Sequence, residues 1–270
     1  MRVAFLSLGL LCLVGLAAGH GEVKGFFKFF FDFENKRQYE RIVGGTTVTI
    51  ARYPFALSLR RYSNHICSAT VISANFAATS AHCTAPLKSL TGLTLYGGST
   101  SLKTGGTSFP VASSIVHPNY NPETFDFDVA VLRVQTPFSS NPNIAPVQLI
   151  AADTKLADRT SLNVIGWGRT MTGESLSPAL RATSIPAISN AVCSAIWSDT
   201  IITDNMLCAG TKGKDSCTGD SGGSLLLLSN NFFSLVGIVS WGSASCGSEY
   251  PGIYARVASP NIRSFLAQYT

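Results

Sequence analysis

Gly219-Asp220-Ser221-Gly222-Gly223 leads directly into the apolar run 224–228, and this succession of turn residues and a short apolar segment recurs along the chain. The other runs, separated by Gly, Pro, Ser and Asn, include 55–59, 70–72, 93–96, 129–134, 162–165 and 235–240. Many short apolar runs between turn residues are typical of an all-β protein, either a sandwich or a barrel.

One helix is predicted at the end of the chain. Ser259-Pro260-Asn261 is a helix start signal, and Ile262, Phe265 and Leu266 follow it at helical spacing. Hydrophobic residues make up 46% of the 270 residues and charged residues only 13%, with the apolar runs spread over the whole chain. This composition predicts a folded chain with a sizeable core, arranged as one large all-β domain or two small ones.

The N-terminal residues predict an export signal. Arg2 supplies a positive charge, residues 3–16 are almost wholly apolar, and Ala17-Ala18-Gly19 offers small residues for cleavage. The alternative is a membrane anchor, which needs about 20 apolar residues; this stretch is shorter, and no later run is long enough. We therefore expect a signal peptide over residues 1–19 and a secreted, extracellular protein without a membrane span.

Residues 20–41 differ from the rest of the chain because they are rich first in Phe and then in charged residues. An aromatic binding arm is one interpretation of this segment. We favour a propeptide that packs against the folded domain or hinders early activity, and such processed segments are kept out of fold arguments. From Ile42 onward the composition is that of a β protein, so we expect one domain over residues 42–270.

Six cysteines remain once Cys12 leaves with the signal: Cys67, Cys83, Cys193, Cys208, Cys217 and Cys246. An even number in an exported chain favours disulfides, although six cysteines permit 15 pairings. No CxxC spacing is present, so a zinc site has little support. Residues 42–270 contain no Lys/Arg cluster, which argues against a nucleic-acid partner.

Ser221 is the candidate nucleophile. A hydroxyl reacts only when it is exposed, lies near a base and has amide donors directed at the developing oxyanion. The flanking glycines allow a tight turn in which a substrate carbonyl can approach the N–H groups of Gly219 and Ser221. A Gly/Ser run alone is more often an ordinary turn, so the assignment depends on a partner base.

Four histidines are available as that base. His82 follows an apolar run and precedes Cys83, which favours a fixed position. His20 lies at the signal boundary, His65 near Cys67 is expected to be structural, and His117 in a turn-like segment is expected to be solvated.

A catalytic imidazole needs a carboxylate that holds its tautomer. Asp128 stands at the start of the apolar run 129–134, where a buried acid requires a partner. Asp126 competes for this role, but it is farther from the run, and we expect it to be solvated or to cap a turn.

Seven motifs in order resemble the trypsin/chymotrypsin family of serine endopeptidases over residues 42–270. They are Ile42-Val43-Gly44-Gly45, Ser80-Ala81-His82-Cys83, Asp128-Val129-Ala130-Val131-Leu132, Gly166-Trp167-Gly168, Gly219 to Gly223, Ser240-Trp241-Gly242 and Pro251-Gly252-Ile253-Tyr254. The resemblance implies two six-stranded antiparallel β-barrels with His82, Asp128 and Ser221 as the catalytic triad between them. It also implies the disulfides Cys67–Cys83, Cys193–Cys208 and Cys217–Cys246.

The resemblance further implies a specificity pocket and an activation switch. Asp215, six residues before Ser221, falls at the base of the pocket; Ser240, Trp241, Gly242 and Gly252 also contribute to substrate binding. A carboxylate there predicts cleavage after Arg or Lys, whereas a surface acid in 212–215 is the alternative. Cleavage between Arg41 and Ile42 would free an ammonium group that pairs with Asp220.

The sequence departs from the family pattern at several small residues. Ser68-Ala69 replace two glycines, Ser80 replaces Ala, and Ser224 replaces Pro. We expect altered packing and an altered efficiency, but not an inactive enzyme. Residues 84–116 contain no Asp or Glu, so the calcium loop of some relatives has no acidic ligands here; we expect no metal and no cofactor.

Three alternatives remain open at this point. The loop 242–251 has chymotrypsin-like lengths on both sides of Cys246, which leaves room for chymotrypsin-like specificity. A catalytically silent homologue would act as a binding protein, and the intact His82, Asp128 and Ser221 argue against it. A regulatory cascade protease would usually carry a disulfide module in place of residues 20–41. We therefore expect a monomeric digestive or secretory-fluid protease whose partners are protein or peptide substrates and protein inhibitors.

Overall fold

The computed structural model describes residues 43–270. The expected signal peptide, the propeptide and the Arg41–Ile42 bond lie outside the described residues. The described part is mostly β-structure, with the short 3₁₀ helices η1 (Ile50–Arg52), η2 (Ala81–Cys83) and η3 (Phe138–Ser140) and the α-helices α2 (Asn190–Ile196) and α3 (Pro260–Ala267).

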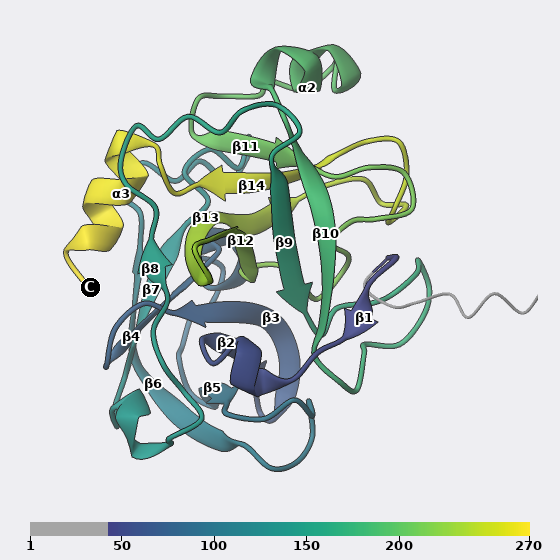
Figure 1. Ribbon diagram of the computed structural model, residues 1–270. Helices are drawn as coiled ribbons and strands as arrows, with labels where there is room; N and C mark the ends of the chain where they lie inside the picture. The colour runs from purple at the N-terminus through teal and green to yellow at the C-terminus, as the bar shows by residue number, and fades with distance from the viewer. Residues whose placement is uncertain (1–42) are drawn as a thin grey trace, which may run out of the picture. The chain divides into compact units, whose positions relative to one another are not determined.

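The first half forms a closed antiparallel barrel in which the strand order is β2-β3-β4-β7-β6-β5 and β5 pairs again with β2. Its strands are β2 (Ala56–Arg61), β3 (Asn64–Val71), β4 (Phe76–Thr79), β5 (Leu93–Gly97), β6 (Thr107–Val116) and β7 (Ala130–Val134). In Figure 1 these strands run from purple-blue to teal.

The second half closes in the same way, in the order β9-β10-β11-β14-β13-β12 and back to β9. Its strands are β9 (Ser161–Gly166), β10 (Arg181–Ile188), β11 (Met206–Ala209), β12 (Ser224–Ser229), β13 (Phe232–Trp241) and β14 (Gly252–Arg256). The two-residue strands β1 (Thr46–Thr47) and β8 (Gln148–Leu149) are added to β10 and β13. The expected pair of six-stranded antiparallel barrels is therefore confirmed (Figure 1).

Inward-facing side chains fill both barrels. Leu57, Leu59 and Leu95 are fully buried in the first barrel, and Leu162 and Leu225 in the second. Burying a Leu side chain stabilises the fold by about 1.5–3 kcal/mol, so these layers explain why the apolar runs form strands. The expected C-terminal helix is α3, which buries Ile262, Phe265 and Leu266; the side chain of Ser259 makes no capping hydrogen bond.

The structure contains the three disulfides Cys67–Cys83, Cys193–Cys208 and Cys217–Cys246. This is the pairing that the resemblance implied. Disulfides persist in oxidising compartments, so three of them fit an extracellular protein. Within residues 43–270, none of the helices has the length and apolar character needed to cross a membrane.

Strand pairing brings His82 and Asp128 together. β4 and β7 are antiparallel neighbours with Thr79 opposite Ala130. The chain leaves β4 at Thr79 and reaches His82 in η2, while Asp128 lies two residues before β7 begins. Residues at neighbouring ends of a paired ladder are close in space, so the register of this pair determines the distance between the imidazole and the carboxylate.

Candidate active site

His82 is held by Asp128 through both its backbone and its ring. The backbone N–H of His82 donates to Asp128 Oδ1 at 2.9 Å, and Nδ1 lies 2.8 Å from Asp128 Oδ2. Asp128 is 1% exposed, and its Oδ2 also accepts a hydrogen bond from the Ser240 hydroxyl. A buried carboxylate with these donors fixes the ring and keeps the proton on Nδ1.

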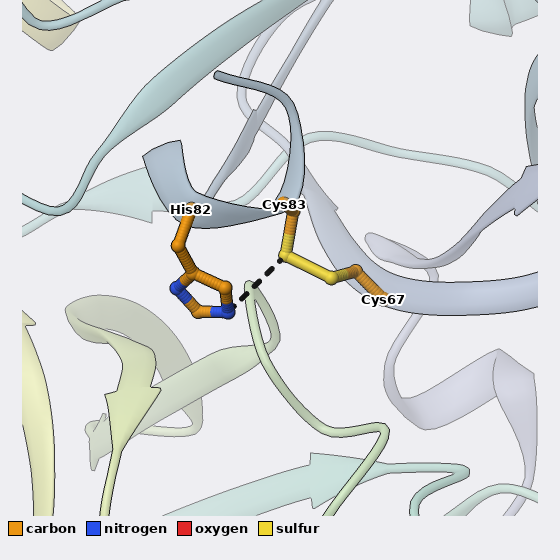
Figure 2. Close-up of side chains that lie close together, drawn as sticks. All are labelled: Cys67, His82 and Cys83. Atoms are coloured by element: carbon orange, nitrogen blue, oxygen red, sulfur yellow. Dashed lines mark hydrogen bonds between the residues drawn. A yellow bond between two sulfur atoms is a disulfide. The ribbon is translucent and has the colours of Figure 1, made fainter. Parts of the chain in front are cut away.

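With the proton on Nδ1, His82 Nε2 carries a free lone pair and can accept a proton. Figure 2 shows this nitrogen near the Cys67–Cys83 disulfide, with 3.6 Å between Nε2 and Cys83 Sγ. A disulfide sulfur carries no proton to donate and is no thiolate, so Cys67, His82 and Cys83 do not form a metal-binding set despite their proximity. The disulfide instead restricts where the ring can move.

Ser221 shares a cavity of about 370 Å³ with His82. No hydrogen bond joins Ser221 Oγ to Nε2 within residues 43–270; such bonds are often long in free enzymes and tighten with substrate. The Ser221 carbonyl accepts from the backbone N–H of Ser68 at 2.7 Å, which ties the serine loop to the first barrel.

The loop before Ser221 presents two free amide donors. Among the described residues, the backbone N–H groups of Gly219 and Ser221 have no acceptor, while the intervening Asp220 N–H donates to Cys217 O at 2.9 Å. Gly219 has a φ of 98°, and a Cβ there would lie 2.6 Å from Leu176 Cδ2. A residue with a side chain would therefore disrupt the turn that exposes these donors.

Asp220 is fully buried beneath this loop. Its carboxylate accepts from Gly168 N at 2.8 Å and from Cys217 N at 2.9 Å. Burial raises the pKa of Asp220 to about 7. A Cβ at Gly166 would lie 2.0 Å from Asp220 Oδ1, and one at Gly168 would lie 2.4 Å from the carboxyl carbon, so both glycines provide the space for this acid.

The floor of the cavity holds a second buried acid, Asp215, which is 4% exposed. Within residues 43–270 its Oδ1 has no hydrogen-bond partner. Burial raises the pKa of Asp215 to about 7 because water no longer stabilises the charged form. An orphaned carboxylate oxygen in a pocket favours a cationic ligand, which would supply the missing donors.

The other predicted pocket residues divide into two groups. Ser240, Trp241 and Gly242 line the cavity, as predicted for substrate binding. The Ser240 hydroxyl, however, donates its hydrogen bond to Asp128 Oδ2. Gly252 is adjacent to Asp215, and a Cβ there would approach Oδ1 to 2.8 Å.

Sequence reasoning missed two aromatic residues in or next to the cavity, among others. Phe125 lines the cavity, and its ring meets that of His82 edge-on with centroids 5.6 Å apart. Trp197 packs against Trp241 at 5.0 Å and donates from Nε1 to Pro251 O at 3.1 Å, which steadies the pocket loop. Neither residue belongs to a recognisable motif. The signal that could have indicated them is an aromatic side chain close in sequence to Asp128 or to Cys193.

The expectations for three further residues can now be compared with the structure. His65 is structural, as expected: Nδ1 lies 2.8 Å from Ser58 Oγ and Nε2 lies 2.8 Å from Gly219 O. His117 was expected to be solvated, which is wrong. It is 4% exposed and stacks on Phe127 at 4.7 Å, and burial lowers its pKa. Asp126 was expected to be solvated or to cap a turn: it is half-buried and accepts a hydrogen bond from the Phe127 backbone N–H at 3.1 Å, but its carboxylate is also bound by side chains of the second barrel, which was not expected.

The serines that depart from the family pattern are buried and hydrogen-bonded. Ser68 Oγ donates to Gly219 O at 3.3 Å, Ser80 Oγ donates to Val239 O at 2.5 Å, and Ser224 Oγ lies 2.6 Å from Thr70 Oγ1. Buried hydroxyls are tolerated when they are paired. All three bonds connect the two barrels around the serine loop.

Known proteins share this arrangement over most of the chain. A family model described as Trypsin matches residues 42–264. Trypsin 5G1 of Aedes aegypti is 40% identical over 227 residues that cover 83% of each chain. Trypsin of Phaedon cochleariae is 38% identical over 81% of this chain and 84% of its own, and Trypsin beta of Drosophila erecta is 36% identical over 84% and 87%. The chain therefore belongs to the trypsin family and is a serine endopeptidase, a hydrolase that acts on protein substrates.

Proposed function

We propose that the chain hydrolyses peptide bonds that follow Arg or Lys, with His82, Asp128 and Ser221 as its triad. Ser221 Oγ attacks the scissile carbonyl carbon while His82 Nε2 accepts its proton. The N–H groups of Gly219 and Ser221 stabilise the oxyanion, and the imidazolium then protonates the leaving amine. In the second step a water molecule attacks the acyl carbonyl carbon, His82 Nε2 again accepts the proton, and the acyl group is released from Ser221.

The buried Asp215 carries the proposal on specificity. Asp215 lines the cavity that Ser221 and His82 also line, and its buried Oδ1 has no hydrogen-bond partner among the described residues. A guanidinium or ammonium group would pair with this oxygen and restore the solvation that burial removed. An apolar side chain would leave this oxygen without a partner, which disfavours Phe, Tyr or Leu before the scissile bond.

A cleavage profile on a diverse peptide library tests this proposal. The activated enzyme should cut after Arg and Lys. Cuts after Phe, Tyr or Leu would show that the 242–251 loop outweighs Asp215, and no cut at all by a correctly processed chain would favour a silent homologue.

Binding of a cationic probe should depend on pH through Asp215. Its carboxyl has a pKa of about 7 in the free pocket, so it is protonated at lower pH, whereas a bound cation needs the ionised form. The Ki of benzamidine, whose charge is constant here, should therefore rise as pH falls from 7 to 5, by at most about tenfold per pH unit. Ki values are measured by competition against a chromogenic ester.

The D215S variant is the control for this titration, since its weaker binding should not change over the same pH range. A wild-type Ki that is constant from pH 5 to pH 7 would contradict a titrating Asp215 in the pocket.

We also propose that residues 1–19 are a signal peptide, that residues 20–41 are a propeptide, and that cleavage at Arg41–Ile42 activates the secreted domain of residues 42–270. Val43, the first described residue, forms an antiparallel bridge with Asp215. The described part of the chain thus begins beside Asp215. Asp220 forms no salt bridge within residues 43–270, and a new ammonium group at Ile42 would neutralise it.

Partners of the enzyme would be protein substrates and protein inhibitors. The enzyme would be a monomer, and its role would be digestive.

Two variants separate processing from the switch. R41Q should block processing by trypsin-like enzymes and leave a nearly inactive precursor. D220N should be processed but should lose roughly 10²- to 10⁴-fold in kcat/KM, because a buried ammonium without its carboxylate costs about 3–5 kcal/mol. N-terminal sequencing beside an ester assay measures both effects.

E249Q, which removes an exposed acid paired with Lys212, serves as the control and should process and work normally. Full activity of the unprocessed precursor would exclude the switch.

A further inference from the structure

Asp126 lies in the segment between β6 and β7, two residues before Asp128, and its contacts cross to the second barrel. Thr203 Oγ1 donates to Asp126 Oδ1 at 2.7 Å. Asn205 Nδ2 donates to Oδ1 at 3.1 Å and to Oδ2 at 3.3 Å. Both partners precede β11, so this half-buried carboxylate joins the loop that carries Asp128 to a different barrel.

The partners of Asp126 are themselves held in place. Asn205 Oδ1 accepts from Ser259 Oγ at 2.6 Å, and Asn205 O accepts from Arg256 N at 2.7 Å. These bonds connect Asn205 to the end of β14 and the start of α3. Asp126 is therefore attached, through Asn205, to the body of the second barrel.

The loop around Asp126 is strained. Phe125 has a φ of 58° and Phe127 a φ of 53°, both in the left-handed region that bulky side chains rarely adopt. Such a conformation persists only where the surroundings hold it. The carboxylate between the two residues supplies such constraints, and its Oδ1 also accepts from the Phe127 N–H at 3.1 Å.

This strained conformation directs both neighbouring rings. Phe125 lines the cavity and packs edge-on against His82 with centroids 5.6 Å apart. Phe127 stacks on His117 with centroids 4.7 Å apart, and its carbonyl accepts from Val129 N at 2.7 Å, which leads the chain into β7. Asp128 lies between Phe127 and Val129, so its position depends on the same loop.

We propose that Asp126 is a positioning residue: its bonds to Thr203 and Asn205 hold the 125–127 loop so that Phe125 and Asp128 are placed against His82. This proposal rests on the triad function proposed above. Misplacing a catalytic group by about 1 Å can cost 10²-fold in rate. Within residues 43–270 the loop forms no hydrogen bond with Asp215, so its displacement should affect proton transfer and leave the binding of a cation by Asp215 unchanged.

The test uses the activated enzyme and three readouts. For D126A we expect kcat on an Arg ester to fall about 10- to 100-fold. The rate at which phenylmethanesulfonyl fluoride sulfonylates Ser221 should fall in parallel, because that reaction also needs His82 to accept the serine proton as fluoride leaves. The Ki of benzamidine should stay within about twofold of wild type, since it reports on Asp215. These factors follow from the misplacement cost.

Two further variants separate positioning from general damage. D126N retains an acceptor for Thr203 and Asn205 and should recover most of the rate, and T203V, which removes one donor, should fall between wild type and D126A. E123A is the matched control, because Glu123 is an exposed acid in the same loop whose carboxylate has no partner among the described residues. It should behave as wild type.

The proposal is overturned if D126A matches E123A in both kcat and sulfonylation, or if D126N falls as far as D126A. Should D126A fail to fold, T203V decides the question by the same readouts. A wild-type enzyme that neither cleaves esters nor reacts with the sulfonyl fluoride would instead refute the proposed triad, so the two failures are distinguishable.

Discussion

Replacing Ser221 with Ala is expected to reduce turnover by a factor approaching ~10⁶, because triad residues act as a unit and removing one forfeits most of the joint effect. The residual rate would come from the oxyanion donors Gly219 and Ser221, whose backbone N–H groups remain. The measurement is the hydrolysis of an Arg ester under single-turnover conditions, with active protein quantified by benzamidine binding.

Binding of benzamidine should be unchanged in S221A, since Asp215 and the cavity walls are intact. S224A is the matched control: it removes a buried hydroxyl three residues away, bonded to Thr70 at 2.6 Å, and should keep activity within about one order of magnitude, as expected from the loss of a single hydrogen bond. A folded S221A enzyme with near-wild-type turnover would falsify the mechanism.

Replacing Asp215 with Ser is expected to lower kcat/KM for Arg and Lys substrates by about 10⁴-fold, the discrimination typical of a site that loses a buried polar partner. The physical reason is that Asp215 is only 4% exposed and that its Oδ1 has no hydrogen-bond partner within residues 43–270. A substrate guanidinium entering the variant would be desolvated without a counter-charge. The kcat/KM for substrates with Leu or Phe before the scissile bond should fall little. The variant is therefore expected to lose its preference for Arg and Lys but to keep its activity on apolar substrates.

E249Q controls for the overall charge around the pocket, because Glu249 is an exposed acid bonded to Lys212 at 2.8 Å. Surface ion pairs contribute about 0–1 kcal/mol, so this variant should keep the preference for Arg and Lys. If D215S and E249Q change the cleavage profile equally, the preference arises from the general field of the protein and not from the pocket acid.

Much of the fold could be predicted from local patterns. The run 129–134 became β7, and 224–228 became β12, because continuous apolar residues bounded by turns are buried on pairing. β6 and β10 were harder to recognise, since Pro110 and Pro186 interrupt them and Ser residues alternate with apolar ones. Their strand conformation depends on pairing with β7 and β9, which is a non-local property.

The candidate site shows the same division. Asp128 could be distinguished from Asp126 because it adjoins the apolar run, and the structure buries it against His82. The burial of His117 could not be inferred from the sequence. One of its ring partners, Phe265, is far away along the chain, and nothing in the sequence marks the other, Phe127, as a partner. Asp126 was misjudged for a related reason, because Thr203 and Asn205 lie more than 70 positions away.

The sequence by itself determined the all-β class, the C-terminal helix and membership of the trypsin family, because each depends on local periodicity or on motifs that are short and ordered. Tertiary structure alone decided which acids lose contact with water and which side chains form hydrogen bonds from one barrel to the other. The pKa values of Asp215 and Asp220, both raised to about 7, illustrate the difference. Burial is the largest cause of both shifts, and burial depends on how β-strands distant in sequence close around the loop.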